Sequence, residues 1–222
     1  MKGQAGQLAK QRFNILLSEN GLDNALTDRI IDWIDPDDTV NALGAENYDY
    51  LGLERPYRSA GVMMSDVSEL RLILELSDKQ FKILAPLVTT LSDPQSAINV
   101  NTASPGVMVA LAPGLGLDEA TSLVSARDED QAYTSLGEFT GDPGLGDSAN
   151  SVKVQGLSVQ SNFFQVNIRA RYQDRFVNLV SIIQRDNVDG SMRVIYRNQS
   201  KRVILDVEAD DTEGTSEQGS ES

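Results

Sequence analysis

The most informative part of this chain is Ile30–Asp38 (IIDWIDPDD), which leads into Gly44–Asp49 (GAENYD). It ends an apolar helical pattern at Pro36, contains the chain's single tryptophan, Trp33, and then places carboxylates in a loop. Nine acidic side chains but one basic side chain, Arg29, lie between positions 23 and 54. Packing so many carboxylates into a folded loop costs repulsion and desolvation unless hard cations or backbone N–H groups neutralise them.

Two interpretations of this acidic loop stay open. The first is a solvated loop whose acids cap helix ends or pair with Arg29, Arg55 or Arg58. The second is a site for calcium, which accepts about six to eight flexible oxygen ligands, whereas magnesium demands a near-ideal octahedron. The candidate ligands are Asp32, Asp35, Asp37, Asp38, Glu46 and Asp49. Their spacing does not match the calcium loop of helix–loop–helix proteins, so the spacing itself assigns no ligand.

Composition excludes several classes of function. The chain has 222 residues, of which 40% are hydrophobic, enough for one large core or two smaller ones. Its net charge of −14 argues against nucleic-acid binding, because phosphate contacts need clustered Lys and Arg. It contains no histidine and no cysteine, which excludes Ser-His-Asp and Cys-His catalysis, thiolate metal sites and disulfides. A hydrolase that uses only carboxylates survives, and would need two acids in a cleft with separated pKa values.

Helical patterns dominate the first 150 residues. Apolar residues at helical spacing predict helices over about residues 4–19 and 23–34, followed by a long acidic loop over about 35–64. Loops of that length are generally functional, ordered by an ion, or disordered, and this one is too apolar for disorder. Three further helix starts are predicted by pairs at the spacing of a capping box. The pairs are Asp66 and Glu69, Ser77 and Gln80, and Ser135 and Glu138.

A helical hairpin is predicted around Pro113–Gly116 (PGLG), with Pro105 at the first position of its first helix. Together with Asn99–Ala103 (NVNTA), it resembles a helix-hairpin-helix, a module that binds DNA through backbone N–H groups of its Gly-x-Gly turn. Here Asp118 and Glu119 follow the turn and would repel a phosphate. A purely structural hairpin is therefore favoured over a nucleic-acid-binding one.

From about residue 151 the apolar pattern changes from helical to alternating, which predicts antiparallel strands. Gln173-Asp174 and Asp189-Gly190 are candidate hairpin turns. After Arg202 the chain carries seven acidic residues and no basic one, a composition typical of disorder. We therefore predict an α+β protein with an α-helical domain over 1–150, an antiparallel β part over 151–203 and a disordered acidic tail over 204–222.

Five motifs, in this order, resemble the K component of type II secretion systems, the large minor pseudopilin. They are Ile31–Asp38, Gly44–Asn47, Pro56–Arg58, Val67–Arg71 and Ile98–Ala103. The resemblance covers about residues 10–200. The five motifs together make it specific, whereas the last motif alone is shared with DNA-binding hairpin proteins.

The resemblance implies a pseudopilin body, in which an N-terminal helix packs against an antiparallel sheet, with a large α-helical domain inserted in it. It implies a non-enzymatic role at the tip of a periplasmic pseudopilus that pushes folded exoproteins through an outer-membrane channel. The implied partners are the I and J minor pseudopilins, in a heterotrimeric tip complex, with secreted exoproteins as further contacts and no nucleic acid. Calcium in the helical domain is also implied, which favours the acidic loop as its site.

The resemblance also implies a membrane anchor that this chain does not show. Prepilin-type proteins start with a basic leader and an apolar helix, and residues 1–7 (MKGQAGQ) lead into neither. No apolar run approaches the ~20 residues that cross a bilayer. We therefore expect a soluble piece, starting at an artificial Met1, of a Gram-negative protein anchored in the inner membrane and facing the periplasm. Early strands of the pseudopilin body are then expected to be missing.

Overall fold

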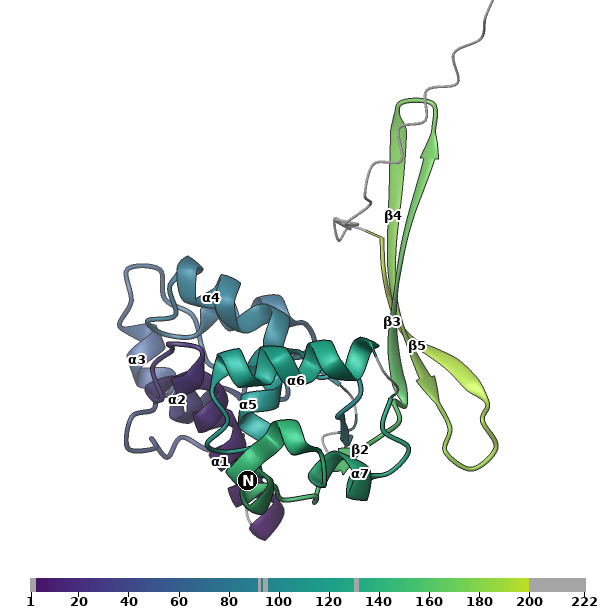
Figure 1. Cartoon of the computed structure of the whole chain (residues 1–222). Helices are drawn as coiled ribbons and strands as arrows, with labels where there is room; N and C mark the ends of the chain where they lie inside the picture. The colour runs from purple at the N-terminus through teal and green to yellow at the C-terminus, as the bar shows by residue number, and fades with distance from the viewer. Residues whose placement is uncertain (1–2, 92, 94–95, 130–131, 200–222) are drawn as a thin grey trace, which may run out of the picture. The chain divides into compact units, whose positions relative to one another are not determined.

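The computed structural model describes residues 3–91, 93, 96–129 and 132–199, and the chain divides into two compact units. Met1–Ser161 form the helical unit and Asn162–Ser222 form the sheet unit (Figure 1). The helices and the antiparallel sheet confirm the predicted α+β class. The boundary lies after residue 161 rather than after residue 150, because the intervening residues pair with the helical unit.

The helical unit combines α-helices, 3₁₀ helices and two very short strands. Its α-helices are α1 (Gln4–Glu19), α2 (Ala25–Ile34), α3 (Asn47–Leu51), α4 (Asp78–Leu84), α5 (Pro105–Leu111), α6 (Leu117–Glu129) and α7 (Leu136–Thr140). Its 3₁₀ helices are η1 (Val67–Leu72), η2 (Ala85–Leu87) and η3 (Pro143–Ser151), and its strands are β1 (Ile98–Asn99) and β2 (Leu157–Ser158). The predicted loop over 35–64 is thus interrupted by α3.

Local sequence signals set several of these helix starts. Two of the three predicted capping boxes form, at the starts of η1 and α4. At the third, the Ser135 hydroxyl accepts a hydrogen bond from the Glu138 N–H, but the Glu138 carboxylate accepts from the N–H of Thr134, one residue before the cap. Helix α5 begins at Pro105, as predicted, since the missing N–H of proline is not needed in a first turn.

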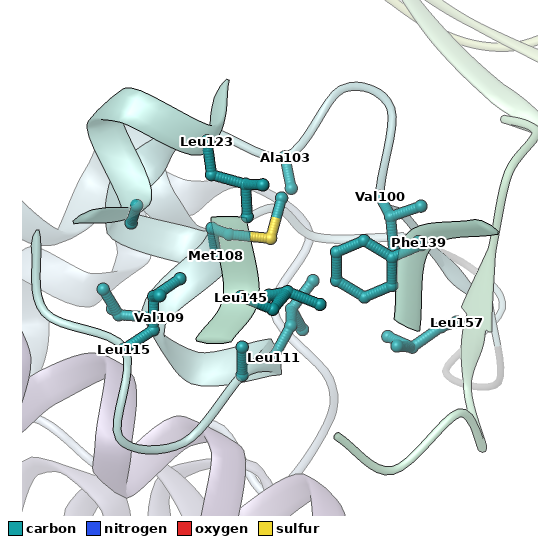
Figure 2. Close-up of a cluster of buried hydrophobic side chains, with 12 residues drawn as sticks. Val100, Ala103, Met108, Val109, Leu111, Leu115, Leu123, Phe139, Leu145 and Leu157 are labelled. Atoms are coloured by element: carbon teal, nitrogen blue, oxygen red, sulfur yellow. The ribbon is translucent and has the colours of Figure 1, made fainter. Parts of the chain in front are cut away.

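Apolar side chains of the helical unit bury two clusters. One joins α5, α6, α7 and η3, with Met108 and Phe139 fully buried in it (Figure 2). Figure 2 shows the Phe139 ring beside Leu157, which comes from β2. The other cluster joins α1, α2, α3 and α4 and contains Trp33 and Tyr50. This second cluster supports the acidic loop.

The segment from 151 to 158 differs from the prediction. It was expected to belong to an antiparallel sheet, but β2 pairs in parallel with β1, Ile98 opposite Leu157 and Asn99 opposite Ser158. Its alternation reflects burial in the helical unit, because Leu157 is buried in the helical core while Val154 is exposed. A parallel pair between residues nearly sixty positions apart leaves no local signal in the sequence.

The sheet unit is an antiparallel sheet in the order β3-β4-β5, made of β3 (Phe163–Tyr172), β4 (Arg175–Arg185) and β5 (Met192–Asn198). Both predicted hairpin turns form, with positive φ at Gln173 (52°) and Gly190 (73°). Strand β5 pairs with the Val180–Arg185 part of β4, so the β3–β4 ribbon extends beyond the end of β5 (Figure 1).

The predicted acidic tail, residues 204–222, lies outside the described residues, as do residues 200–203 of the predicted β part. In the described part of the chain, no helix has the length and apolar character needed to cross a bilayer.

Candidate metal centre

Asp32 organises the acidic loop from inside. It lies in the last turns of α2 and is completely buried. The Asn41 N–H donates to Asp32 Oδ2 (3.1 Å), and the Asn41 side-chain amide donates to Asp32 Oδ1. Gly44 packs directly on this carboxylate, because a Cβ at Gly44 would lie 1.7 Å from Asp32 Oδ2. Asp32 therefore fixes the backbone of residues 41–44.

Three of the six candidate ligands meet in one cluster. Carboxylate oxygens of Asp35, Asp37 and Glu46 lie within 4.8 Å of one another. Asp35 follows α2 and Glu46 precedes α3, so the end of one helix meets the start of another. Glu46 is 2% exposed, and within the described residues neither of its carboxylate oxygens has a hydrogen-bond partner. Asp35 Oδ1 is also buried without a partner among those residues.

Burial and mutual repulsion make ionisation of the clustered carboxylates unfavourable. Burial, together with the nearby charges of Asp32, Asp35 and Asp38, raises the pKa of Glu46 to about 7. Burial, followed by repulsion from Asp37 and Asp32, also raises the pKa of Asp35. Both carboxylates would be stabilised in their ionised form by a cation placed between them.

The remaining candidates hold the loop together by hydrogen bonds. Asp38 accepts a hydrogen bond from the side-chain amide of Asn47 (2.8 Å), and Asp49 accepts one from the Glu46 N–H (2.9 Å). The Glu46 side chain in turn faces the N–H of Asp49, as in a capping box, but outside hydrogen-bonding geometry. Arg29 pairs with Glu75 (2.5 Å). Asp32, Asp38 and Asp49 thus hold the loop, while Asp35, Asp37 and Glu46 face one another.

Aromatic packing holds the middle and the second half of the loop against α2. Trp33 meets Tyr50 edge to face, with ring centroids 5.1 Å apart, and meets Tyr57 at 6.2 Å. The Gly61 N–H donates to the Trp33 carbonyl (3.0 Å). The distant end of the loop is therefore tied to the helix turn that carries Asp32.

Sequence reasoning missed the roles of Asn41 and Gly44. Asn41 gave no signal of its own. Gly44 begins one of the five family motifs and is typical of a loop, but its sequence context does not indicate a close approach of another group. Here it is the Asp32 carboxylate that approaches.

The donor set of the cluster suits a hard cation. Three carboxylates supply oxygen ligands only, which Ca²⁺ prefers. Calcium–oxygen distances of about 2.3–2.6 Å place two opposing ligand oxygens at most about 5 Å apart. The 4.8 Å spread of the carboxylate oxygens fits that separation. A cation bound to Glu46 would explain why its carboxylate oxygens are buried without a hydrogen-bond partner among the described residues.

The hairpin turn between α5 and α6 is closed to phosphate. The Gly116 N–H, which a helix-hairpin-helix would offer to DNA, donates to the carboxylate of Glu119 (2.8 Å). Arg127, the nearby base, is buried and donates to the carbonyl oxygens of Val100 and Ala103 (2.9 Å each). Both the Gly116 N–H and the Arg127 guanidinium thus bond within the chain, which favours a structural role for this hairpin over DNA binding.

Comparisons with known proteins identify the family. Models described as type II secretion system (T2SS), protein K match residues 1–93 and 98–160. The chain belongs to the type II secretion system protein K family. The expected resemblance is confirmed, and the two matched segments together contain the acidic loop and the hairpin.

Individual relatives agree with this assignment. Type II secretion system protein K of Pseudomonas aeruginosa is 36% identical over 201 residues, covering 86% of this chain and 57% of the relative. That of Aeromonas hydrophila is 33% identical over 175 residues, covering 72% of this chain and 50% of the relative. The chain thus spans about half the length of the curated relatives it matches.

A solved structure shares the fold. A chain in the crystal structure of the GspK-GspI-GspJ complex of the enterotoxigenic Escherichia coli type 2 secretion system superposes with a TM-score of 0.74. The match covers 87% of this chain and 70% of that chain, at 23% sequence identity.

Proposed function

We propose that this chain is part of a minor pseudopilin that assembles with the I and J minor pseudopilins at the tip of a type II secretion pseudopilus. The observation that carries the proposal is the shared fold with a chain of the GspK-GspI-GspJ complex over 87% of this chain. Membership of the protein K family supports it independently, through the matches over residues 1–93 and 98–160.

The size of the helical unit favours a capping role in this proposal. A helical unit of 161 residues accompanies a single three-stranded sheet. Such bulk fits once at the end of a filament, whereas a repeating subunit would have to accommodate it at every position. In this role the whole protein is anchored in the inner membrane, faces the periplasm and supports the export of folded exoproteins without catalysing a reaction.

The test is complex formation. The purified chain is mixed with the periplasmic parts of its cognate I and J components and passed over a size-exclusion column. The mixture of I and J without this chain is the control. We expect all three chains in one peak, at a smaller elution volume than the control. Elution of this chain on its own would contradict the proposal. Retention of the chain on duplex DNA at physiological salt would instead revive the nucleic-acid alternative.

We also propose that Asp35, Asp37 and Glu46 bind a structural calcium ion. The buried and unpartnered carboxylate of Glu46 supports this assignment, as does the raised pKa of Asp35. Bound there, the ion would join the end of α2 to the start of α3. Asp32, Asp38 and Asp49, the other candidate ligands, would position the loop around it.

Equilibrium dialysis against calcium tests this site. The wild-type chain and a Glu19→Gln control, altered at an exposed position on α1, should bind calcium equally. Glu46→Gln should lose binding, because it removes a charged ligand. Equal binding by Glu46→Gln and the wild type would remove Glu46 from the ligand set.

A further inference from the structure

Arginines gather at the end of the β3–β4 ribbon. Arg169 and Arg171 on β3 and Arg175 at the start of β4 are all exposed. The strand register places Arg171 opposite Phe176 and Arg175 opposite Tyr172, within the last few residue pairs of the ribbon. Arg169, Arg171 and Phe176 therefore share one face of the ribbon, and Arg175 lies on the other face. Asp174, in the turn, is the single carboxylate between positions 162 and 185. We call these three arginines, with Phe176, the ribbon end.

The charge of the ribbon end is not neutralised within the described residues, where none of its three arginines forms an ion pair. The guanidinium groups of Arg169 and Arg171 lie 4.1 Å and 5.6 Å from the centre of the Phe176 ring. Stacking of this kind holds a guanidinium group in place while its N–H edge can still meet a carboxylate. The ribbon end is therefore organised to bind an anionic group.

The chain itself supplies an oppositely charged segment. Residues 206–221 carry seven acidic side chains and no basic one, whereas residues 162–199 carry six arginines and three aspartates. This acidic segment follows the sheet unit directly in sequence. Near the ribbon end in sequence, this segment has the largest excess of acidic over basic residues.

Strand β5 runs toward the arginines. Strand β5 ends at Asn198, which pairs with Val180, and its antiparallel course points from there toward the start of β4 at Arg175. The five steps of β4 from Val180 to Arg175 span about 17 Å. The eight steps from Asn198 to Asp206 span at most about 27 Å. Residues from Asp206 onward can therefore reach the ribbon end.

We propose that the acidic segment, residues 206–221, binds the ribbon end of the same chain. The contacts are ion pairs between its carboxylates and the guanidinium groups of Arg169, Arg171 and Arg175. Tethering makes such pairs effective although each is weak, because a short linker holds the segment at a millimolar effective concentration. The bound segment shields a basic surface from other acidic proteins.

Paramagnetic relaxation in the full chain tests this contact. The chain has no cysteine, so Ser216→Cys gives a single position for a nitroxide spin label. At low salt we expect the label to weaken the backbone amide signals of Ala170–Phe176 more than those of the helical unit. The signals should recover in ~1 M NaCl, where the Debye length is about 3 Å.

Two variants make the test specific. Replacing Arg169, Arg171 and Arg175 together by glutamine should restore the signals at low salt. A matched variant with the same loss of charge, Lys79→Gln, Lys153→Gln and Arg193→Gln, should leave them weakened. If the arginine variant does not fold, converting the four acids Asp206, Glu208, Asp210 and Asp211 to their amides should restore the signals without touching the sheet.

Three outcomes would overturn the proposal. The first is ribbon-end signals that the label does not weaken at low salt. The second is weakening that survives loss of the three arginines or of the four acids. The third concerns a mixture of two samples, a spin-labelled chain without ¹⁵N and a ¹⁵N-labelled chain without the spin label. Equal weakening of the amide signals in this mixture would show that the segment binds another copy of the chain.

Discussion

Replacing Glu46 by glutamine should stabilise the calcium-free chain and abolish its stabilisation by calcium. Glu46 is buried, its carboxylate oxygens have no hydrogen-bond partner among the described residues, and its pKa is raised to about 7 from an ordinary value of 4.5. A glutamine keeps the size of the side chain but removes the charge. The substitution should therefore act in opposite directions with and without the metal.

The magnitude follows from the pKa of Glu46. Because that pKa is higher in the folded chain than in the unfolded one, the contribution of Glu46 to stability is greatest below about pH 4.5 and is lost as the pH rises through 7. A tenfold change in proton affinity corresponds to about 1.4 kcal/mol, so the ionised side chain lowers the free energy of unfolding by on the order of 3 kcal/mol at pH 8. The buried glutamine amide also lacks partners, so we expect a net gain of about 1–3 kcal/mol in chelator.

Calcium should stabilise only one of the two proteins. A ligand at one hundred times its dissociation constant adds about 2.7 kcal/mol to the wild type and should add nothing to Glu46→Gln. Thermal melts at pH 8, in EGTA and in excess calcium, measure both effects, with Glu19→Gln as the control. A melting temperature of Glu46→Gln below that of the wild type in EGTA, or an equal rise of both melting temperatures in calcium, would refute the role assigned to Glu46.

Three further predictions concern the loop and the core. Gly44→Ala should lower the free energy of unfolding by about 1–3 kcal/mol in a urea titration, because its Cβ would overlap the Asp32 carboxylate. Gly52→Ala is the control and should change little, because its Cβ would have an ordinary 3.4 Å contact. Equal effects of the two substitutions would refute the close packing of Gly44 on Asp32. Arg127→Met should cost about 2–4 kcal/mol by urea denaturation, because two buried carbonyl groups lose their donor, and a loss below about 0.5 kcal/mol would contradict its assigned role. Calcium affinity, measured by calorimetry, should fall as the pH drops below about 7, since Glu46 must release its proton to bind the metal; an affinity that is constant from pH 8 to pH 5.5 would contradict this.

The sequence predicted the helical elements well because their signals are local. Capping residues and proline positions act within one turn, and they correctly indicated the starts of η1, α4 and α5. The segment 151–158 was misread because its pairing with β1 is parallel and distant in sequence. Its alternation of apolar and polar residues could not distinguish a strand of the sheet unit from one packed on the helical core.

The candidate metal centre was predicted as a region but not as a set of ligands. All six acids lie in the loop that composition singled out, yet only Asp35, Asp37 and Glu46 converge. Which carboxylates converge depends on how the end of α2 meets the start of α3. That arrangement is held by packing of Trp33 on Tyr50 and by the hydrogen bonds between Asn41 and Asp32. No spacing rule within the sequence contains this information.

Native mass spectrometry of the three components tests the central proposal most directly. The chain is mixed, in the presence of calcium, with the periplasmic parts of the I and J minor pseudopilins proposed as its partners, and the mass of the intact assembly is measured. We expect one species with a single copy of each chain and the added mass of bound calcium. With Glu46→Gln the added mass of calcium should disappear, while all three protein chains stay in the assembly. A spectrum in which I and J associate while this chain stays free would contradict the assignment to the tip complex.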